Sequence, residues 1–224
     1  MFCPAVIILA AGASRRMGSP KLLLPWGGTT VLGHLIRQWQ KLKVGQVGVV
    51  CSVQAPGIHD ELDSLRFPEA NRIINPEPER GMLSSIRCAA AWRGWRKEIT
   101  HWIITLGDQP HLQEKTLRAL LRFGSAHPDN ICQPMRKGRP RHPVLLPEKA
   151  FVALRNSPAG NLKEFLQSRQ NEKAGFESDD AGLDFDMDEP ADYERAMSVA
   201  EVYDRSKLAR EARNRHPQNA AAKR

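Results

Sequence analysis

The chain has 224 residues, with 33 Lys and Arg against 25 Asp and Glu and a formal net charge of +8. Hydrophobic residues make up 41% of it and charged residues 26%. This length and balance fit one globular domain with its own core, and they exclude a fully disordered chain. The sequence contains no run of about 18 apolar residues, so we expect no transmembrane helix.

The N-terminal segment and the cysteines both favour a cytoplasmic protein. The apolar run at 6–11 is too short for a signal peptide and is followed by Arg15 and Arg16. The four cysteines are far apart in the sequence and form no CxxC motif. We therefore expect them to be reduced thiols, most of them buried among apolar residues.

The positive charge is concentrated at the C-terminal end. Residues 204–224 hold seven Lys and Arg and two Asp and Glu, which gives this segment a net charge of +5. We expect one domain over residues 1–203 and a basic, flexible tail over 204–224. Because the rest of the chain carries little net charge, we expect no specific nucleic-acid binding.

In the first half of the chain, short apolar runs alternate with amphipathic segments. The run at 5–10 is apolar throughout, as expected of a strand buried on both faces. The apolar residues of 29–43 fall on one face of a helix. The further elements are expected, in chain order, as a strand at 47–51, a helix at 56–65, a strand at 72–74, a helix around 82–90, a strand at 102–106 and a helix at 113–123.

The second half of the chain is less regular. A strand-like segment at 130–132 leads into an excursion at 135–147, rich in Arg and Pro, that returns as a strand at 144–146. The remaining expected elements are a helix at 161–167, a short strand at 183–188 and a helix from about 190 to 207. The alternation of strands and helices predicts a three-layer α/β fold with a mostly parallel sheet. Ligands of such sheets bind beyond the carboxyl ends of the strands.

The segment that follows the first strand has the features of a phosphate-binding loop. It reads LAAGASRRMGSPK over residues 9–21. Gly12 allows a tight turn at the end of the strand, and Gly18 leaves space for a phosphate group to approach. Backbone N–H groups, together with Arg16 and Lys21, would hold several phosphates. The segment is neither a Walker A loop nor a GxGxxG motif.

This loop resembles the nucleotidyltransferase signature of the molybdenum cofactor cytidylyltransferase family, within the wider MobA-like group. Four further segments resemble motifs of that family in the same order: GMLSSI at 81–86, LGDQP at 106–110, HPVL at 142–145 and DMDEPADY at 186–193. The resemblance implies a Rossmann-like nucleotidyltransferase fold. It also implies Mg²⁺-dependent transfer of CMP from CTP to molybdopterin cofactor, with release of pyrophosphate, in the maturation of a molybdenum hydroxylase apoenzyme.

The resemblance implies roles for individual residues as well. Arg16, Lys21 and Asp108 would be catalytic, because group transfer of this kind needs positioned phosphates and neutralised charge. Asp108 and Asp188 would bind Mg²⁺, which suits one or two carboxylates together with phosphate oxygens and water. The nucleotide would be bound by Leu9, Ala10, Ala11, Gly12, Ser84 and Ser85, and the acceptor by Arg141 and His142.

Structural roles stay open for several of these residues. Asp108 would otherwise cap a turn before Pro110, and Asp188 would be the N-cap of the last helix. Asp186 and Asp192 compete with Asp188 for both roles. Ser84 and Ser85 would otherwise cap a helix or face solvent. Arg141 would otherwise be solvated, and His142 would have a structural role. Arg141 also replaces a glycine of the family pattern, which leaves the acceptor less well defined than the nucleotide.

Three other functions are compatible with the same motifs. Within the family, LAAG is associated with CTP and LAGG with GTP, and a methyl group at Ala11 would narrow the base pocket. One methyl group supplies only about 1–3 kcal/mol of discrimination, so a guanylyltransferase stays open. A different phosphorylated acceptor is a second alternative. The third is a non-catalytic accessory protein that binds cofactor and nucleotide.

Overall fold

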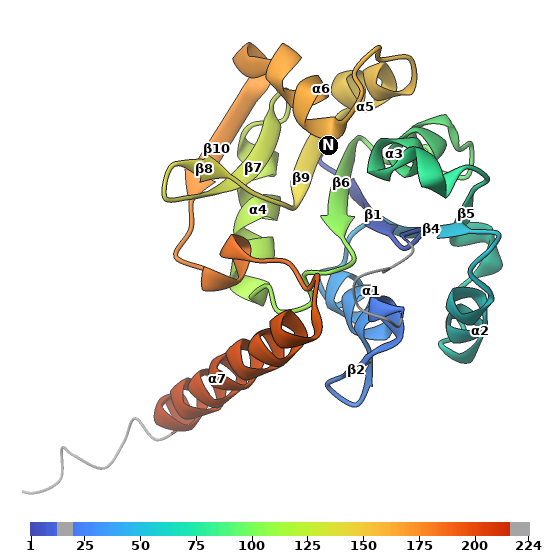
Figure 1. Ribbon diagram of the computed structural model, residues 1–224. Helices are drawn as coiled ribbons and strands as arrows, with labels where there is room; N and C mark the ends of the chain where they lie inside the picture. Colours follow the sequence, from blue (N-terminus) through green and yellow to red (C-terminus); the bar gives the residue numbers. More distant parts are fainter. Residues whose placement is uncertain (13–19, 216–224) are drawn as a thin grey trace, which may run out of the picture.

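The computed structural model describes residues 1–12 and 20–215, with side chains described as far as Tyr203. Its main feature is an eight-stranded sheet in which seven strands follow the order β10-β7-β9-β6-β1-β4-β5 and β8 pairs with β7 (Figure 1). The strands of this sheet are β1 (Pro4–Leu9), β4 (Gln46–Ser52), β5 (Arg72–Asn75), β6 (His101–Leu106), β7 (Ile131–Arg136), β8 (Arg139–Pro140), β9 (Val144–Pro147) and β10 (Lys173–Glu177). A small antiparallel ribbon consists of β2 (Pro25–Trp26) and β3 (Thr29–Thr30).

The strands of the central sheet are parallel except for β8 and β9. Strand β1 pairs in parallel with both β4 and β6, and β4 pairs in parallel with β5. Strand β9 is antiparallel to its neighbours β6 and β7, while β10 is parallel to β7. The predicted mostly parallel sheet is therefore confirmed. In consequence the carboxyl ends of β1, β4, β5 and β6 lie along one edge of the molecule.

Helices cover both faces of this sheet. They are α1 (Val31–Lys41), α2 (Pro56–Ser64), α3 (Met82–Ala91), α4 (Glu114–Ala126), α5 (Glu148–Arg155), α6 (Leu162–Ser168) and α7 (Pro190–Arg215). Alternate residues of β1 supply the two cores: Val6 and Ile8 pack in one, Ala5 and Ile7 in the other. The first core holds the buried faces of α1, α2, α4 and the start of α7, and the second holds those of α3, α5 and α6. The three-layer prediction is confirmed (Figure 1).

Most predicted elements are present, with ends shifted by a few residues. Helix α1 begins after Thr30, whose side chain accepts a hydrogen bond of 3.0 Å from the backbone N–H of Gly33. This is the cap that a threonine before an apolar helix provides. Helix α7 extends to Arg215, beyond the expected end near 207, and Figure 1 shows it projecting away from the sheet. No helix of the described residues is long and apolar enough to cross a membrane.

The expected strand at 183–188 is wrong. The structure has a short 3₁₀ helix, η6 (Ala181–Asp184), and then an extended segment that pairs with no strand. The side chain of Asp180 caps η6 by accepting a hydrogen bond from Gly182 N. Leu183 and Met187 are buried, so the apolar pattern is real, but the backbone N–H of Met187 donates to Asp108 O in the loop after β6. The segment is thus held against the end of the sheet without extending it.

Helix α5 and strand β10 are the longest elements without a predicted counterpart. Helix α5 follows β9 directly, with Pro147 at its N-cap position and Glu148 as its first residue. Strand β10 is half exposed and contains Gly175, so it shows no apolar alternation. Strand β10 lies at the edge of the sheet and pairs with β7 alone, and none of its residues is fully buried. Its sequence therefore carries only a weak apolar pattern.

Candidate active site

The predicted phosphate-binding loop begins at the edge where parallel strands end. Ala10 continues the strand β1 by donating from its backbone N–H to Val50 O at 2.8 Å. Ala10 and Ala11 are buried, while Gly12 is exposed and a Cβ built there would meet no atom of the described residues within 4 Å. Arg16 lies outside the described residues.

Gly107 lets the end of β6 approach the end of β1. A Cβ built at this glycine would be 2.8 Å from the backbone oxygen of Leu9 and 2.8 Å from the side chain of Leu22. Because backbone cannot yield as a flexible side chain can, any larger residue would push the two strand ends apart. The glycine of the LGDQP segment therefore places Asp108 beside the end of β1.

Lys21 connects two of the predicted acidic residues. Its ammonium nitrogen lies 2.7 Å from Oδ2 of Asp108 and 3.4 Å from Oδ1 of Asp188. Side chains at 21 and 108 are each 18% exposed, and that at 188 is 39% exposed. Three residues from distant parts of the sequence thus meet at the carboxyl end of β1 and β6, as the motifs predict.

The segment around Met187 places Asp188 in this group. Met187 is fully buried and its backbone N–H donates to Asp108 O at 3.1 Å, so its neighbours in the extended segment point the other way. The N-cap alternative for Asp188 is wrong: the carboxylate of Asp192 accepts hydrogen bonds from the backbone N–H groups of Asp188 and Glu189. The side chain of Asp188 forms the ion pair with Lys21 instead.

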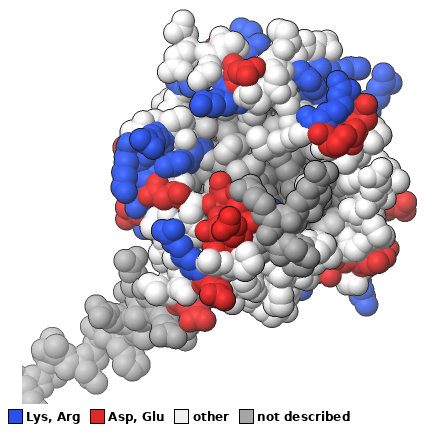
Figure 2. All heavy atoms as spheres, viewed as in Figure 1, with Lys and Arg blue, Asp and Glu red and all other residues white. Residues whose placement is uncertain are grey.

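Asp186 adds a third carboxylate to the site. Its Oδ1 accepts a hydrogen bond of 2.7 Å from the side-chain amide of Gln109. Burial and the nearby charges of Asp108 and Asp188 raise the pKa of Asp186. Within the described residues, negative charge therefore exceeds positive charge at this point. Figure 2 shows Asp and Glu atoms gathered near the centre of this face.

The residues present fit a divalent cation bound together with phosphate groups. Oδ1 of Asp108 is buried and has no hydrogen-bond partner among the described residues. Carboxylate oxygens are the ligands that a hard cation such as Mg²⁺ prefers. In the described part of the chain, no group of three or more His, Cys, Asp and Glu side chains is close enough to form a complete protein cage. A cation here would need phosphate oxygens and water to fill its coordination sphere.

Ser84 and Ser85 lie in the first turns of α3, beside the end of β5. Both hydroxyl oxygens accept hydrogen bonds from the side-chain amide of Asn75, at 2.8 and 2.9 Å. A cavity of about 330 Å³ between β5 and α3 is lined in part by Asn75, Glu77 and Ser84. The two serines are therefore part of a polar cluster, and Asn75, which sequence reasoning missed, is its centre.

Arg141 and His142 lie on the opposite side of β6, where the chain enters β9. The guanidinium of Arg141 pairs with Oδ1 of Asp184 at 3.0 Å, and Arg136 pairs with Oδ2 of the same residue at 2.9 Å. The hydrogen bond from Arg136 holds the pKa of the Asp184 carboxyl below its usual range. Figure 2 shows the resulting group of Lys and Arg atoms over the β8 region. This group is cationic, as an acceptor with phosphates would require.

His142 is neutral at physiological pH. Burial lowers its pKa to about 4, against an opposing effect of the Asp108 charge and of a hydrogen bond to the backbone of Ile104. Its Nδ1 is buried and has no hydrogen-bond partner among the described residues. The histidine thus lies close enough to Asp108 to sense its charge, but it does not supply a positive charge itself.

Sequence reasoning missed Gln109 and Asp184 as well as Asn75. Gln109 is part of the LGDQP segment, so its position after Asp108 was a usable signal, and its amide fixes Asp186. Asp184 lies within the segment taken for a strand, and no motif marks it. Its role becomes visible only when the fold brings it between Arg136 and Arg141.

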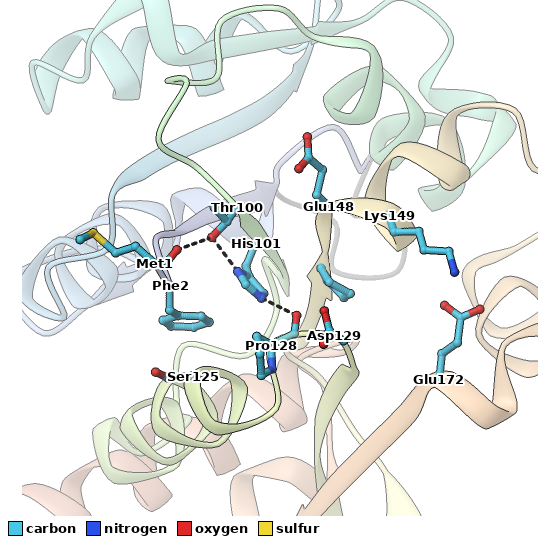
Figure 3. Close-up of a pocket in the computed structure, with 11 residues that line it drawn as sticks. Met1, Phe2, Thr100, His101, Ser125, Pro128, Asp129, Glu148, Lys149 and Glu172 are labelled. Carbon is cyan, nitrogen blue, oxygen red and sulfur yellow. Dashed lines mark hydrogen bonds between the residues drawn. The ribbon is translucent and has the colours of Figure 1, made fainter.

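A second cavity, of about 710 Å³, lies at the opposite end of the strands and does not resemble a binding site (Figure 3). His101 is its most buried polar group, and both of its ring nitrogens already have partners in the protein, Thr100 Oγ1 at 2.8 Å and Pro128 O at 2.9 Å. Figure 3 shows both bonds. No described polar group of His101 is left to bind a ligand there.

Comparison with known proteins agrees with this geometry. The sequence profile of the MobA-like NTP transferase domain matches residues 6–174. The molybdenum cofactor cytidylyltransferase of Escherichia coli K12 is 26% identical over 191 residues, which covers 84% of this chain and 92% of that protein.

Solved structures agree on the fold. A nucleotidyl transferase from Methanothermobacter thermautotroptrophicus (Mth528) superposes with a TM-score of 0.74 at 18% identity, covering 90% of this chain and 99% of that one. Rv0371c from Mycobacterium tuberculosis H37Rv superposes with a TM-score of 0.69 at 24% identity, covering 88% of this chain and 98% of that one.

Proposed function

Because the chain belongs to the MobA-like NTP transferase family and is a nucleotidyltransferase, we propose that it transfers CMP from CTP to molybdopterin cofactor and releases pyrophosphate. The observation that carries this proposal is the contact of Lys21 with Asp108 and Asp188 at the end of β1 and β6. The similarity to a molybdenum cofactor cytidylyltransferase over most of both chains supports this choice of substrates.

In this reaction a phosphate oxygen of the acceptor attacks the α-phosphorus of CTP. The bond between that phosphorus and the oxygen bridging to the β-phosphate breaks, and its electron pair leaves with pyrophosphate. Lys21 and Arg16 would hold the triphosphate and neutralise the charge that develops on the leaving group. Backbone N–H groups of the loop after β1 would orient the phosphates. The chain needs no nucleophile of its own, because the acceptor supplies it.

The carboxylates at the same edge would hold Mg²⁺. Asp108 and Asp188 are the proposed ligands, and the buried, unpartnered Oδ1 of Asp108 supports the first of them. When bound, the ion would neutralise the α-phosphate and the leaving group. Asp186 would not bind the ion directly. It would add negative charge next to Asp108 and Asp188, and its hydrogen bond with Gln109 would hold it in place. Lys21 would move from the carboxylates toward the phosphates when the nucleotide enters.

The nucleotide base would lie between the LAAG segment and the start of α3. Leu9 is the last residue of β1, and Ala10, Ala11 and Gly12 follow it. Ser84 and Ser85 lie in the first turn of α3. The side chain of Ala11 is 9% exposed, so a methyl group borders the space that a base would enter. This favours a pyrimidine over a purine, by about 1–3 kcal/mol at most for one methyl group. The expected preference is therefore CTP over GTP.

The acceptor would bind on the β8 side of the site. Arg141 is the proposed contact for its phosphate, with Arg136 alongside, since both guanidinium groups converge on Asp184. A phosphate entering here would compete with Asp184 for these donors. His142, neutral and partly buried, would contribute a hydrogen bond and no charge. The product would serve a molybdenum hydroxylase apoenzyme.

A matrix of nucleotides against acceptors tests the proposal. CTP, GTP, ATP and UTP are each combined with molybdopterin, with and without bound molybdenum, and with sugar phosphates, and pyrophosphate release is measured with and without Mg²⁺. Turnover that needs CTP, molybdopterin and Mg²⁺ supports it. Turnover with GTP or a sugar phosphate would keep the transferase and change its substrates. Binding without pyrophosphate release in any combination would indicate an accessory protein.

A further inference from the structure

Asn75 uses both hydrogens of its side-chain amide to hold the two serines of α3. It is the last residue of β5 and is 1% exposed. Its amide nitrogen donates to Ser84 Oγ at 2.8 Å and to Ser85 Oγ at 2.9 Å. Its amide oxygen accepts from the backbone N–H of Glu77 at 2.9 Å. This last bond fixes which end of the amide faces the serines, because a backbone N–H only donates.

Ser84 has no hydrogen left for a ligand. Its hydroxyl group donates one hydrogen and accepts with two lone pairs. The oxygen already accepts from Asn75, and it lies 2.8 Å from Gly81 O and 3.1 Å from Glu77 O, two backbone acceptors. The single hydroxyl hydrogen is therefore directed to the backbone. Ser84 closes the turn at the start of α3, which is a structural role.

Ser85 differs from its neighbour in this respect. Its oxygen also accepts from Asn75, but its hydroxyl hydrogen has no acceptor among the described residues. The residue is 5% exposed, so this hydrogen is buried without a partner, which is unfavourable unless a ligand accepts it. A hydroxyl that already accepts from an amide is left as a donor.

We propose that Asn75 is a positioning residue that fixes Ser85 as a hydrogen-bond donor to the nucleotide base, while Ser84 is structural. The inference rests on the proposed nucleotide-binding function of this site. The partner of Ser85 is then an acceptor atom of the base. Cytosine has two such atoms side by side, O2 and N3, whereas uracil carries a hydrogen on N3. The amide of Asn75 thus makes Ser85 the donor in the hydrogen bond to the base, although Asn75 itself does not contact the base.

Calorimetric titration of CTP, together with kcat and KM for pyrophosphate release, tests this assignment. Ser85→Ala should weaken CTP binding about tenfold, the loss of one good hydrogen bond, and raise KM while changing kcat little. Ser84→Ala should cost less CTP affinity than Ser85→Ala and should lower the melting temperature instead. Equal losses for the two serines, or a larger loss at Ser84, would overturn the assignment.

Asn75 is then tested through its coupling to Ser85. Asn75→Ala should weaken CTP binding in the wild-type background and add little to the loss in a Ser85→Ala background, since it acts through that hydroxyl. Equal losses in both backgrounds would overturn the inference. Asn75→Asp keeps the shape of the side chain and is measured in the same two backgrounds if the alanine variant does not fold. Asn130→Ala, at the start of β7, is the matched control for the loss of a partly buried asparagine.

The same titrations separate this inference from the proposed function. If the wild-type protein binds no nucleoside triphosphate, the proposed function fails. If the wild-type protein binds CTP and the Asn75 variants, folded, bind it equally well, only the inference fails.

Discussion

Lys21 and Asp108 are separated by 87 residues in the sequence, and their side chains form an ion pair of 2.7 Å. The register of the sheet produces this contact. Strand β1 pairs with β6 so that Leu9 lies opposite Leu106, the last residue of β6. The two strands therefore end at the same level of the sheet. Whatever follows the two strands is therefore brought together, and in this chain it is a basic loop and an acidic turn.

The contact predicts the effect of removing the carboxylate. Asp108→Asn keeps the size of the side chain but removes its charge, so we expect turnover to fall by about 10²-fold or more at saturating Mg²⁺, as when a preorganised charge is removed. The protein should stay folded, because the variant relieves repulsion with Asp186. Pyrophosphate release and thermal unfolding measure the two effects. Asp129→Asn, at the opposite edge of the sheet, is the control. Near wild-type turnover in folded Asp108→Asn would exclude the proposed metal role.

Removing the ammonium group should act on the same step. Lys21→Met keeps the length of the side chain but removes its charge, and we expect turnover to fall by about 10²-fold or more. Arg16→Ala should have an effect of similar size if that residue holds the triphosphate. Lys41→Met is a matched control, since Lys41 forms an exposed ion pair with Glu114 away from the site. Loss of stability with unchanged turnover would instead show that Lys21 is structural.

Gly107 should be intolerant of even one methyl group. In Gly107→Ala the added Cβ would lie 2.8 Å from Leu9 O, so the ends of β1 and β6 must separate. We expect a loss of about 1–3 kcal/mol of unfolding free energy, the usual cost of overpacking, together with lower activity. Gly12→Ala offers a comparison for stability, because its Cβ would meet none of the atoms that the structure describes within 4 Å. Urea unfolding of both variants checks this, and equal stabilities would contradict it.

The sequence predicted the fold, and the closeness of Lys21, Asp108 and Asp188, because both depend on local pattern. Buried parallel strands appear as continuous apolar runs, and the residues after them are the site by topology. The failures share a physical cause. The segment at 183–188 has the apolar spacing of a strand, but its partner is a loop, and no local pattern carries that information. Asn75 was missed for a similar reason, since its partners lie in the following helix and its own neighbours are ordinary.

Acid should destabilise the protein through its buried histidines. Burial lowers the pKa of His101, so in the range just below its ordinary pKa of 6.5 the unfolded chain binds a proton that the folded chain does not. The contribution of a neutral His101 to stability is therefore present above that pH and is lost as the pH falls. In His101→Gln the unfolding free energy should decrease less between pH 7.5 and pH 5 than in the wild type. Denaturant titrations measure that free energy at both pH values, and an equal decrease in the two proteins would contradict this.

Nucleotide choice provides the last test. We expect wild-type kcat/KM to favour CTP over GTP with the same acceptor, and Ala11→Gly to weaken that preference. The reason is steric: Ala11 lies where the chain leaves β1, and its methyl group should obstruct a purine more than a pyrimidine. One methyl group supplies about 1–3 kcal/mol, or up to roughly 200-fold, so a complete exchange of nucleotides should require further changes around Ser85.

Measuring kcat/KM for both nucleotides in both proteins decides between the outcomes. A wild-type preference for GTP, or a preference that Ala11→Gly leaves unchanged, would remove the steric basis for the cytidylyl assignment. The nucleotidyltransferase chemistry would stand in either case, because the proposed mechanism assigns it to Lys21 and Asp108 and not to the base. The two questions are separable for a structural reason: the charges lie at the ends of β1 and β6, and the serines lie beside β5.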